Sequence, residues 1–167
     1  LIKKGHRNIG FIGYRYDMSV MNARLSGYKR ALESNGIPVR PEYIGDGKHS
    51  EESGREQTEM LLDLPEPPTA IHCANELMAQ SAAQALQLRG LRIPDDVSLT
   101  GFDNTAIART LNPALTTVEQ PIYDMAQTAV NLLLDQINSR TSAKKPKHIF
   151  LPHRLIERKS VSVPKNK

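Results

Sequence analysis

The chain has 167 residues, of which 39% are hydrophobic and 24% are charged, and its single cysteine excludes an internal disulfide. This is the length of one ordinary domain, long enough to bury a hydrophobic core. The sequence has no run of 18 apolar residues, which excludes a membrane-spanning helix, and no charged-apolar-small leader that would indicate secretion. We therefore expect a cytoplasmic protein in which Cys73 is reduced and buried.

The net charge of +4 is unevenly distributed along the chain. Residues 141–167 carry a net charge of +7, so residues 1–140 sum to −3. This pattern favours a solvated end, frayed over Lys159–Lys167, rather than a phosphate-binding surface. Zinc-finger spacing and a helix-turn-helix pattern are absent from the sequence, and few aromatic residues are available for base stacking. The chain alone is not predicted to read DNA.

Apolar runs of strand length alternate with helical patterns along the chain. We predict strands over Ile9–Tyr14, Tyr43–Ile44, Thr69–Ala74, Val97–Phe102, Leu115–Val118 and, interrupted by Pro152, His148–Leu155. We predict helices from near Ser19 to Gly36, from Ser50 to the Pro65 turn, from Asn75 to Gly90 and from Pro121 to Ile137. Leu1–Gly5 has the pattern of a last helical turn and suggests a fragment of a longer protein.

Helical spacing identifies the residues expected to face the core. They are Met21, Leu25, Tyr28 and Leu32 in the first helix, Met60 and Leu61 in the second, and Ala79, Ala82, Ala83 and Leu86 in the third. In the helix from Pro121 to Ile137, the apolar surface is so broad that we expect burial against more than one neighbour.

Strands that alternate with helices predict the α/β class, with a parallel sheet between two layers of helices. In such a sheet every strand-to-helix loop lies at the same edge. Tyr14–Asp17, Asp46–His49, Asn75–Glu76 and Asp103–Asn104 are therefore expected to converge.

A catalytic or metal site is one interpretation of this edge. Asp46, His49, Glu76 and Asp103 could form an acid-base or metal cluster. However, the sequence has no Gly-rich phosphate loop, no nucleophile elbow and no two-histidine metal motif. Each acid also has a structural alternative, such as capping a turn or favouring a helix N-terminus. We predict no catalytic residue, no metal and no cofactor.

A binding site built on Arg24 and Asp103 is the second interpretation. An arginine and a carboxylate at one sheet edge, with Asn75, Tyr14 and Tyr16 nearby, would supply donors and acceptors to a polar small molecule. The structural alternative is that Arg24 and Asp103 simply pair with each other.

The same residues carry a resemblance to a known family. The chain resembles the effector-binding domain of the lactose/galactose-repressor (LacI/GalR) family, and in its later portion the purine-repressor branch. The phrases that carry the resemblance run in order over nearly the whole chain: GHRNIGFIG (5–13), RLSGYKRAL (24–32), PTAIHCANELMA (68–79), GLRIPDDVSLTGFDN (90–104), NPALTTVEQP (112–121) and LPHRLIERKSV (151–161).

The resemblance implies a type I periplasmic-binding-protein-like fold, with two α/β lobes and a ligand between them. Residues 1–118 and 147–162 would form the C-terminal lobe. Residues 119–146 would form the crossover and a helix of the N-terminal lobe, residues 163–167 a disordered tail, and the DNA-binding domain would lie outside this chain. The helix from Pro121 to Ile137 would then have its apolar surface exposed or covered by another copy.

The resemblance also implies roles for particular residues. Effector contacts would come from Arg24, Asn75 and Asp103, while His49 stands where the family often has a stacking aromatic residue. Glu76 replaces the usual aspartate. Thr116, Thr117 and Gln120 would form the hinge between lobes.

The implied function is that of a transcription regulator whose homodimer binds operator DNA with an affinity set by a sugar, nucleoside or purine-like effector. The first alternative is a periplasmic sugar-binding protein of a transporter, and the second is an enzyme using Asp103 and Glu76.

Overall fold

The computed structural model describes residues 1–14, 19–47, 51–138 and 147–165. Six strands form one sheet in the order β2-β1-β3-β4-β5-β6. Neighbours among β1 to β5 pair in parallel, whereas β6 pairs antiparallel with β5. The strands are β1 (Ile9–Tyr14), β2 (Ile44–Gly47), β3 (Ala70–Cys73), β4 (Ser98–Asp103), β5 (Thr116–Glu119) and β6 (Arg154–Ile156). The predicted α/β class and parallel sheet are confirmed.

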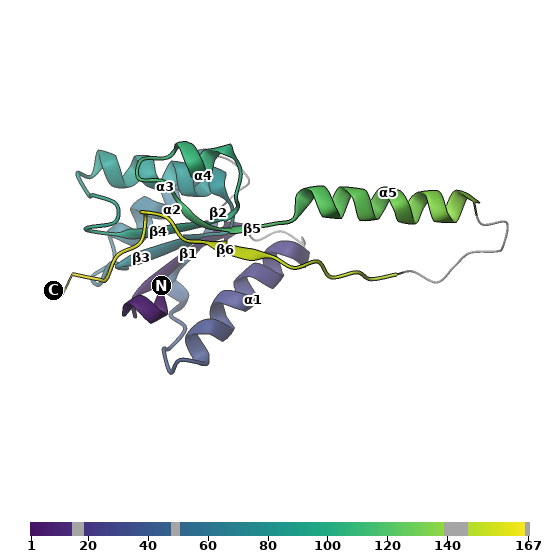
Figure 1. Ribbon diagram of the computed structural model, residues 1–167. Coiled ribbons are helices and arrows are strands. Elements are labelled where there is room, and N and C mark those ends of the chain that lie inside the picture. The colour runs from purple at the N-terminus through teal and green to yellow at the C-terminus, as the bar shows by residue number, and fades with distance from the viewer. Residues whose placement is uncertain (15–18, 48–50, 139–146, 166–167) are drawn as a thin grey trace.

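Helices lie on both faces of the sheet, with α1 on one face and α2, α3 and α4 on the other (Figure 1). Their bounds are α1 (Ser19–Glu33), α2 (Glu51–Leu62), α3 (Glu76–Leu88) and α4 (Ala106–Thr110). Helix α4 was not expected, because the segment after Asp103 has the composition of an irregular loop. Short 3₁₀ turns cover Ile2–Lys4 and Pro41–Tyr43, and Gly5 ends the first of them with a φ of 98°.

The central strands are apolar because helices cover both of their faces. Ile12, Ile71 and Leu99 are almost completely buried and lie on three adjacent strands. The predicted stripe of α1 is also confirmed at Met21, Tyr28 and Leu32, which are all buried. In α2 the prediction is correct for one residue of two.

Leu61 is 2% exposed, whereas Met60 is 62% exposed. Adjacent helical residues point about 100° apart, so only one of the two can face the sheet from this helix.

The fifth helix, α5 (Ile122–Asn138), extends away from the sheet beyond the end of β5 (Figure 1). It has no buried residue, and Val130, Leu133 and Ile137 are each more than half exposed. The expected burial against several neighbours is therefore wrong within the described chain, and the exposed apolar surface implied by the family resemblance is confirmed. None of the described helices is long and apolar enough to cross a membrane.

The carboxyl-terminal segment is more ordered, and its strand shorter, than the sequence suggests. The strand that pairs with the sheet is Arg154–Ile156, an edge strand that starts after Pro152 and overlaps the predicted strand His148–Leu155 only at Arg154 and Leu155. The expected fraying beyond Lys159 is wrong as far as Lys165. Ser160 is fully buried and its hydroxyl donates to the Leu99 carbonyl at 2.6 Å.

The buried ring of His6 lies 2.9 Å from the carbonyl oxygen of Ser162, and Lys165 contacts Asp96 at 2.6 Å. Hydrogen bonds to β4 and to the segments that precede β1 and β4 thus hold a segment whose composition alone suggested a solvated tail.

Candidate functional site

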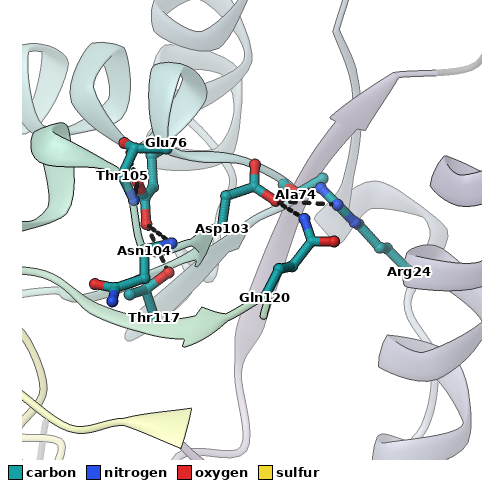
Figure 2. Close-up of polar contacts among 8 residues, drawn as sticks. All are labelled: Arg24, Ala74, Glu76, Asp103, Asn104, Thr105, Thr117 and Gln120. Atoms are coloured by element: carbon teal, nitrogen blue, oxygen red, sulfur yellow. Dashed lines mark hydrogen bonds and ion pairs between the residues drawn. The ribbon is translucent and has the colours of Figure 1, made fainter. Parts of the chain in front are cut away.

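The carboxyl ends of the five parallel strands lie at one edge of the sheet, as predicted, because all five run in the same direction. This edge carries Asp103 at the end of β4 and Gln120 just beyond β5. Arg24, from the early turns of α1, points toward the same place (Figure 2). The structure therefore brings together three polar side chains from segments far apart in the sequence.

Asp103 is the centre of this cluster. One of its carboxylate oxygens, Oδ1, accepts a hydrogen bond from Arg24 at 3.3 Å and another from the side-chain amide of Gln120. The side chains of Arg24 and Asp103 are 12% and 24% exposed, respectively. The pairing that the sequence left open is thus present, and both partners remain at the surface of the edge.

Two further contacts hold the Arg24 guanidinium in place. It donates to the carbonyl of Ala74 at the end of β3, and it lies over the ring of Phe102, 3.9 Å from the ring centroid. A cation over an aromatic face is attracted by the ring quadrupole. Arg24 is therefore fixed by a carbonyl, a carboxylate and a ring, with three separate contacts on one planar group.

The electrostatics of Asp103 reflect its half-buried position. Burial raises the pKa of this carboxyl, while the nearby Arg24 charge and the Gln120 hydrogen bond act in the opposite direction. The ionised carboxylate is thus incompletely compensated by its protein partners. Hydroxyl or amine groups of a ligand could complete that compensation by donating hydrogen bonds to it.

Asn75 and Glu76 occupy structural positions near the cluster. The Asn75 side chain caps α3 by accepting from the Met78 amide at 3.0 Å. Glu76 is 2% exposed and accepts hydrogen bonds from the turn after Asp103. The helix-terminal position expected for Glu76 is confirmed, and its carboxylate faces the main-chain amides of Asn104 and Thr105 (Figure 2).

The side chains of four predicted residues are not described. Tyr16 and His49 lie outside the described residues, and of Tyr14 and Asp46 only the backbone is described, in β1 and β2. Within the described ranges, no group of three or more His, Cys, Asp or Glu side chains is arranged to hold a metal ion.

The predicted hinge residues have different environments. Thr116 and Thr117 are buried in β5, where they pair with Thr100 and Gly101 of β4. Gln120 follows the strand and reaches back to Asp103. The two threonines are thus held in the strand ladder, whereas Gln120 lies beyond it.

Side chains also connect the Asp103 turn to the last two strands. The side-chain amide of Asn104 donates to Glu119 of β5 at 2.7 Å through its nitrogen and accepts from Arg158 at 2.6 Å through its oxygen. Glu119 in turn accepts from Arg154 of β6 at 2.8 Å. The turn that presents Asp103 is therefore joined to the strands through which the chain leaves and re-enters the sheet.

Sequence reasoning missed two contributors to the cluster, the ring of Phe102 and the hydrogen bond from Gln120 to Asp103. Phe102 directly precedes Asp103, and an aromatic residue beside a predicted arginine partner is the signal that could have identified it. Gln120 gave no local signal, because its contact depends on the pairing of β4 with β5.

The fold and the site can be compared with known proteins. A family model described as a periplasmic binding protein-like domain matches residues 1–161. The chain is 41% identical to the HTH-type transcriptional repressor CytR of Escherichia coli (strain K12) over 140 residues, or 84% of this chain and 41% of that protein.

The chain is also 41% identical to the HTH-type transcriptional repressor PurR of Escherichia coli (strain SMS-3-5 / SECEC) over 162 residues, or 97% of this chain and 47% of that protein. It thus spans a little under half the length of both curated relatives.

Among solved structures, a sugar-binding transcriptional regulator of the LacI family from Escherichia coli, complexed with phosphate, has a TM-score of 0.86 at 36% identity. The match covers 98% of this chain and 58% of that one. These similarities confirm the predicted resemblance, including the purine-repressor branch among the relatives.

Proposed function

Because the chain belongs to the periplasmic-binding-protein-like domain family, in the form found in LacI-family regulators, we propose that it is the effector-sensing part of a bacterial transcription regulator. A small polar effector would bind at the Asp103 edge, between this lobe and a second one. Its preference for one arrangement of the lobes would change the affinity of a homodimer for operator DNA. DNA would be bound by a region outside this chain, and the regulator would act in the cytoplasm.

The cluster of Arg24, Asp103 and Gln120 is the observation that carries this proposal. It combines a planar five-donor group, a carboxylate with spare acceptor capacity and an amide at one sheet edge. These groups suit the vicinal hydroxyls of a sugar or nucleoside, or the polar edge of a purine ring. No nucleophile or proton-transfer pair is needed to explain the arrangement.

The division of the chain into lobes is part of the same proposal. Residues 1–118 and 147–162 would form one lobe, and 119–146 the crossover and a helix of the other. Support comes from α5, which leaves the sheet after β5 and has no buried residue. An amphipathic helix exposed in this way is expected of an element whose packing partner lies elsewhere.

Two alternatives are less well supported. A periplasmic sugar-binding protein would share the fold, but both curated relatives described above are transcriptional repressors. An enzyme using Asp103 and Glu76 would need the two carboxylates to act on one substrate. Instead, Glu76 is buried beneath the turn and hydrogen-bonded to its backbone.

Effector binding by the complete regulator tests the proposal. A panel of hexoses, ribonucleosides and purine bases would be screened by thermal shift, since a ligand that binds only the folded state raises the melting temperature. For any compound that binds, Arg24→Ala and Asp103→Ala should each weaken affinity by at least about tenfold, because each removes charge-assisted hydrogen bonds. The compound should also change operator affinity.

Arg89→Ala is a matched control, because Arg89 forms ion pairs with Glu59 and Asp63 on an exposed surface. It should leave effector affinity unchanged. Unchanged effector binding in both Arg24→Ala and Asp103→Ala would show that the effector binds elsewhere. Binding without any change in operator affinity would refute the regulatory role.

A further inference from the structure

A buried carboxylate lies beneath the turn that presents Asp103. Glu76, in the first turn of α3, accepts hydrogen bonds from the main-chain amides of Asn104 at 2.7 Å and Thr105 at 2.6 Å. It also accepts from the hydroxyl of Thr105 and, at 2.7 Å, from that of Thr117 on β5. Figure 2 shows these contacts on the side of the turn away from Arg24.

These four donors are all uncharged, so the buried Glu76 carboxylate is held by hydrogen bonds from neutral groups. Burying an ionised carboxylate is costly unless donors replace the water that it loses. Each Glu76 oxygen receives one main-chain N–H and one hydroxyl: Oε1 from Asn104 and Thr117, and Oε2 from Thr105 twice. Hydroxyl groups can rotate to donate or accept, but main-chain amides can only donate.

Because each carboxylate oxygen faces one main-chain N–H, both terminal atoms of the side chain must be acceptors. A glutamine has one acceptor oxygen and one NH₂ group. Whichever way it were turned, one of the two main-chain amides would face a donor. A carboxylate is therefore specifically suited to this position, and an isosteric amide is not.

The turn that Glu76 holds is strained. Asp103 has a φ of 112° and Asn104 a φ of 57°, a region that residues with a side chain rarely adopt. Such conformations persist only where surrounding contacts enforce them. The two amides bound by Glu76 belong to the residues immediately after Asp103, so the carboxylate acts directly on the backbone that sets the direction of the Asp103 side chain.

The sheet is also shaped to admit Glu76. A Cβ added at Gly101 of β4 would lie 2.7 Å from Cδ2 of Leu115 and 3.2 Å from Cγ of Glu76. A larger residue at this position would therefore collide with Leu115 and press on the Glu76 stem.

We propose that Glu76 is a positioning residue for Asp103: its buried carboxylate holds the backbone of Asp103 and Asn104 in its positive-φ conformation and so aims the Asp103 side chain at Arg24. This inference rests on the proposed function only for the statement that Asp103 then contacts an effector. The positioning itself is a property of this chain and can be measured without a ligand.

The interaction between Arg24 and Asp103 provides that measurement. A double-mutant cycle with Arg24→Met and Asp103→Asn would be carried out in urea unfolding of this chain, first in the native background and then with Glu76→Gln. In the native background the two changes should be coupled by about three- to tenfold in the unfolding equilibrium constant. With Glu76→Gln, the coupling should fall to within about twofold of none.

A purely structural role would give a different result. Glu76→Gln would then lower stability while the coupling between Arg24 and Asp103 stayed the same, and that outcome would overturn the proposal. Glu59→Gln is the matched control, because Glu59 pairs with Arg89 at the surface of α2. It should leave the coupling unchanged.

A milder variant keeps the test decisive if Glu76→Gln does not fold. Thr117→Val removes one hydroxyl donor to the carboxylate and leaves both main-chain amides in place. It should speed hydrogen exchange at the Asn104 and Thr105 amides by at least about threefold relative to the Leu99 amide, and it should reduce the Arg24–Asp103 coupling. Faster exchange with unchanged coupling, or no change in either quantity, would also overturn the proposal.

Failure of the proposed function would look different from failure of this inference. If no effector bound the complete regulator but the coupling depended on Glu76, the positioning role would stand and the effector site would be wrong.

Discussion

Helices α3 and α5 meet opposite environments although each follows a strand of the same sheet and each has an apolar face. In α3, Met78, Ala79, Ala82 and Leu86 are almost completely buried against the sheet. In α5 no residue is buried, and Leu133 is 57% exposed. An amphipathic pattern therefore predicts that a helix has a face to bury, but not that the same chain supplies the surface that covers it.

The largest expected difference between the two helices is the effect of a leucine truncation. Leu86→Ala should lower the free energy of unfolding by about 2–5 kcal/mol, because it leaves a cavity in a packed core. Leu133→Ala, which removes the same atoms from α5, should change it by no more than about 0.5 kcal/mol. Urea denaturation of the two variants, followed by circular dichroism, measures both values.

If both truncations cost more than about 2 kcal/mol, α5 is packed in solution against a surface that this chain alone does not show. If neither truncation costs that much, Leu86 does not contribute to the cooperative unfolding of the sheet.

Acid should affect the sheet but not α5. Burial, with a smaller contribution from the Arg24 charge, lowers the pKa of His72 on β3 to about 4. An unfolded histidine has a pKa of about 6.5, so the unfolded chain binds more protons between these values and stability falls as the pH drops from 6.5 toward 4. For His72 alone we expect a loss of about 2 kcal/mol between pH 7.5 and pH 5.

The variant His72→Asn isolates this contribution. Burial also lowers the pKa of His6, so some acid sensitivity should remain in the variant. Between pH 7.5 and pH 5, the native protein should lose about 2 kcal/mol more free energy of unfolding than the His72→Asn variant. Parallel curves over pH 5–7.5 would show that His72 is protonated without cost. Helix α5 has no histidine, so its own helicity should not follow this titration.

The smallest expected effect on stability is that of a charge placed on α5. The double substitution Leu133→Lys and Ile137→Lys should change the free energy of unfolding of the sheet by less than about 0.5 kcal/mol, because both side chains are more than half exposed. It should, however, reduce concentration-dependent association, because an exposed apolar face favours contact with another copy. Sedimentation velocity over a range of concentrations measures this association.

A native chain that remains a monomer throughout that range would count against self-association through α5. As a control, Lys165→Ala changes an exposed charge at the far end of the chain and should not affect association.

Most of the sheet could be predicted because its signals are local. The continuous apolar runs of β1 and β3 are enough to indicate strands covered on both faces, and the alternation with helices then implies parallel pairing. The expected fraying beyond Lys159 failed for the opposite reason. Ser160 and Ser162 are held by partners at Leu99 and His6, which are remote in sequence.

The candidate site was predictable in part for a similar reason. Arg24 and Asp103 could be placed at one edge from the sequence because the common direction of parallel strands brings their elements together there. The backbone conformation of Asp103 could not be predicted, because a φ of 112° is unfavourable for a non-glycine residue. It depends on the contacts of Glu76, which come from a different part of the chain. Residue type likewise did not reveal that Gln120 turns back toward Asp103.

The antiparallel pairing of β6 with β5 has a consequence for how the chain could be rebuilt. Glu119 is the register partner of Arg154, so everything from residue 120 to residue 153 is topologically the loop of a β-hairpin. The entropic cost of closing a loop rises by about 0.6 kcal/mol for each doubling of its length, so this long insertion costs roughly 2.5 kcal/mol more than a two-residue turn would. Replacing it with a two-residue Asn-Gly turn should yield a smaller scaffold that keeps the six-stranded sheet.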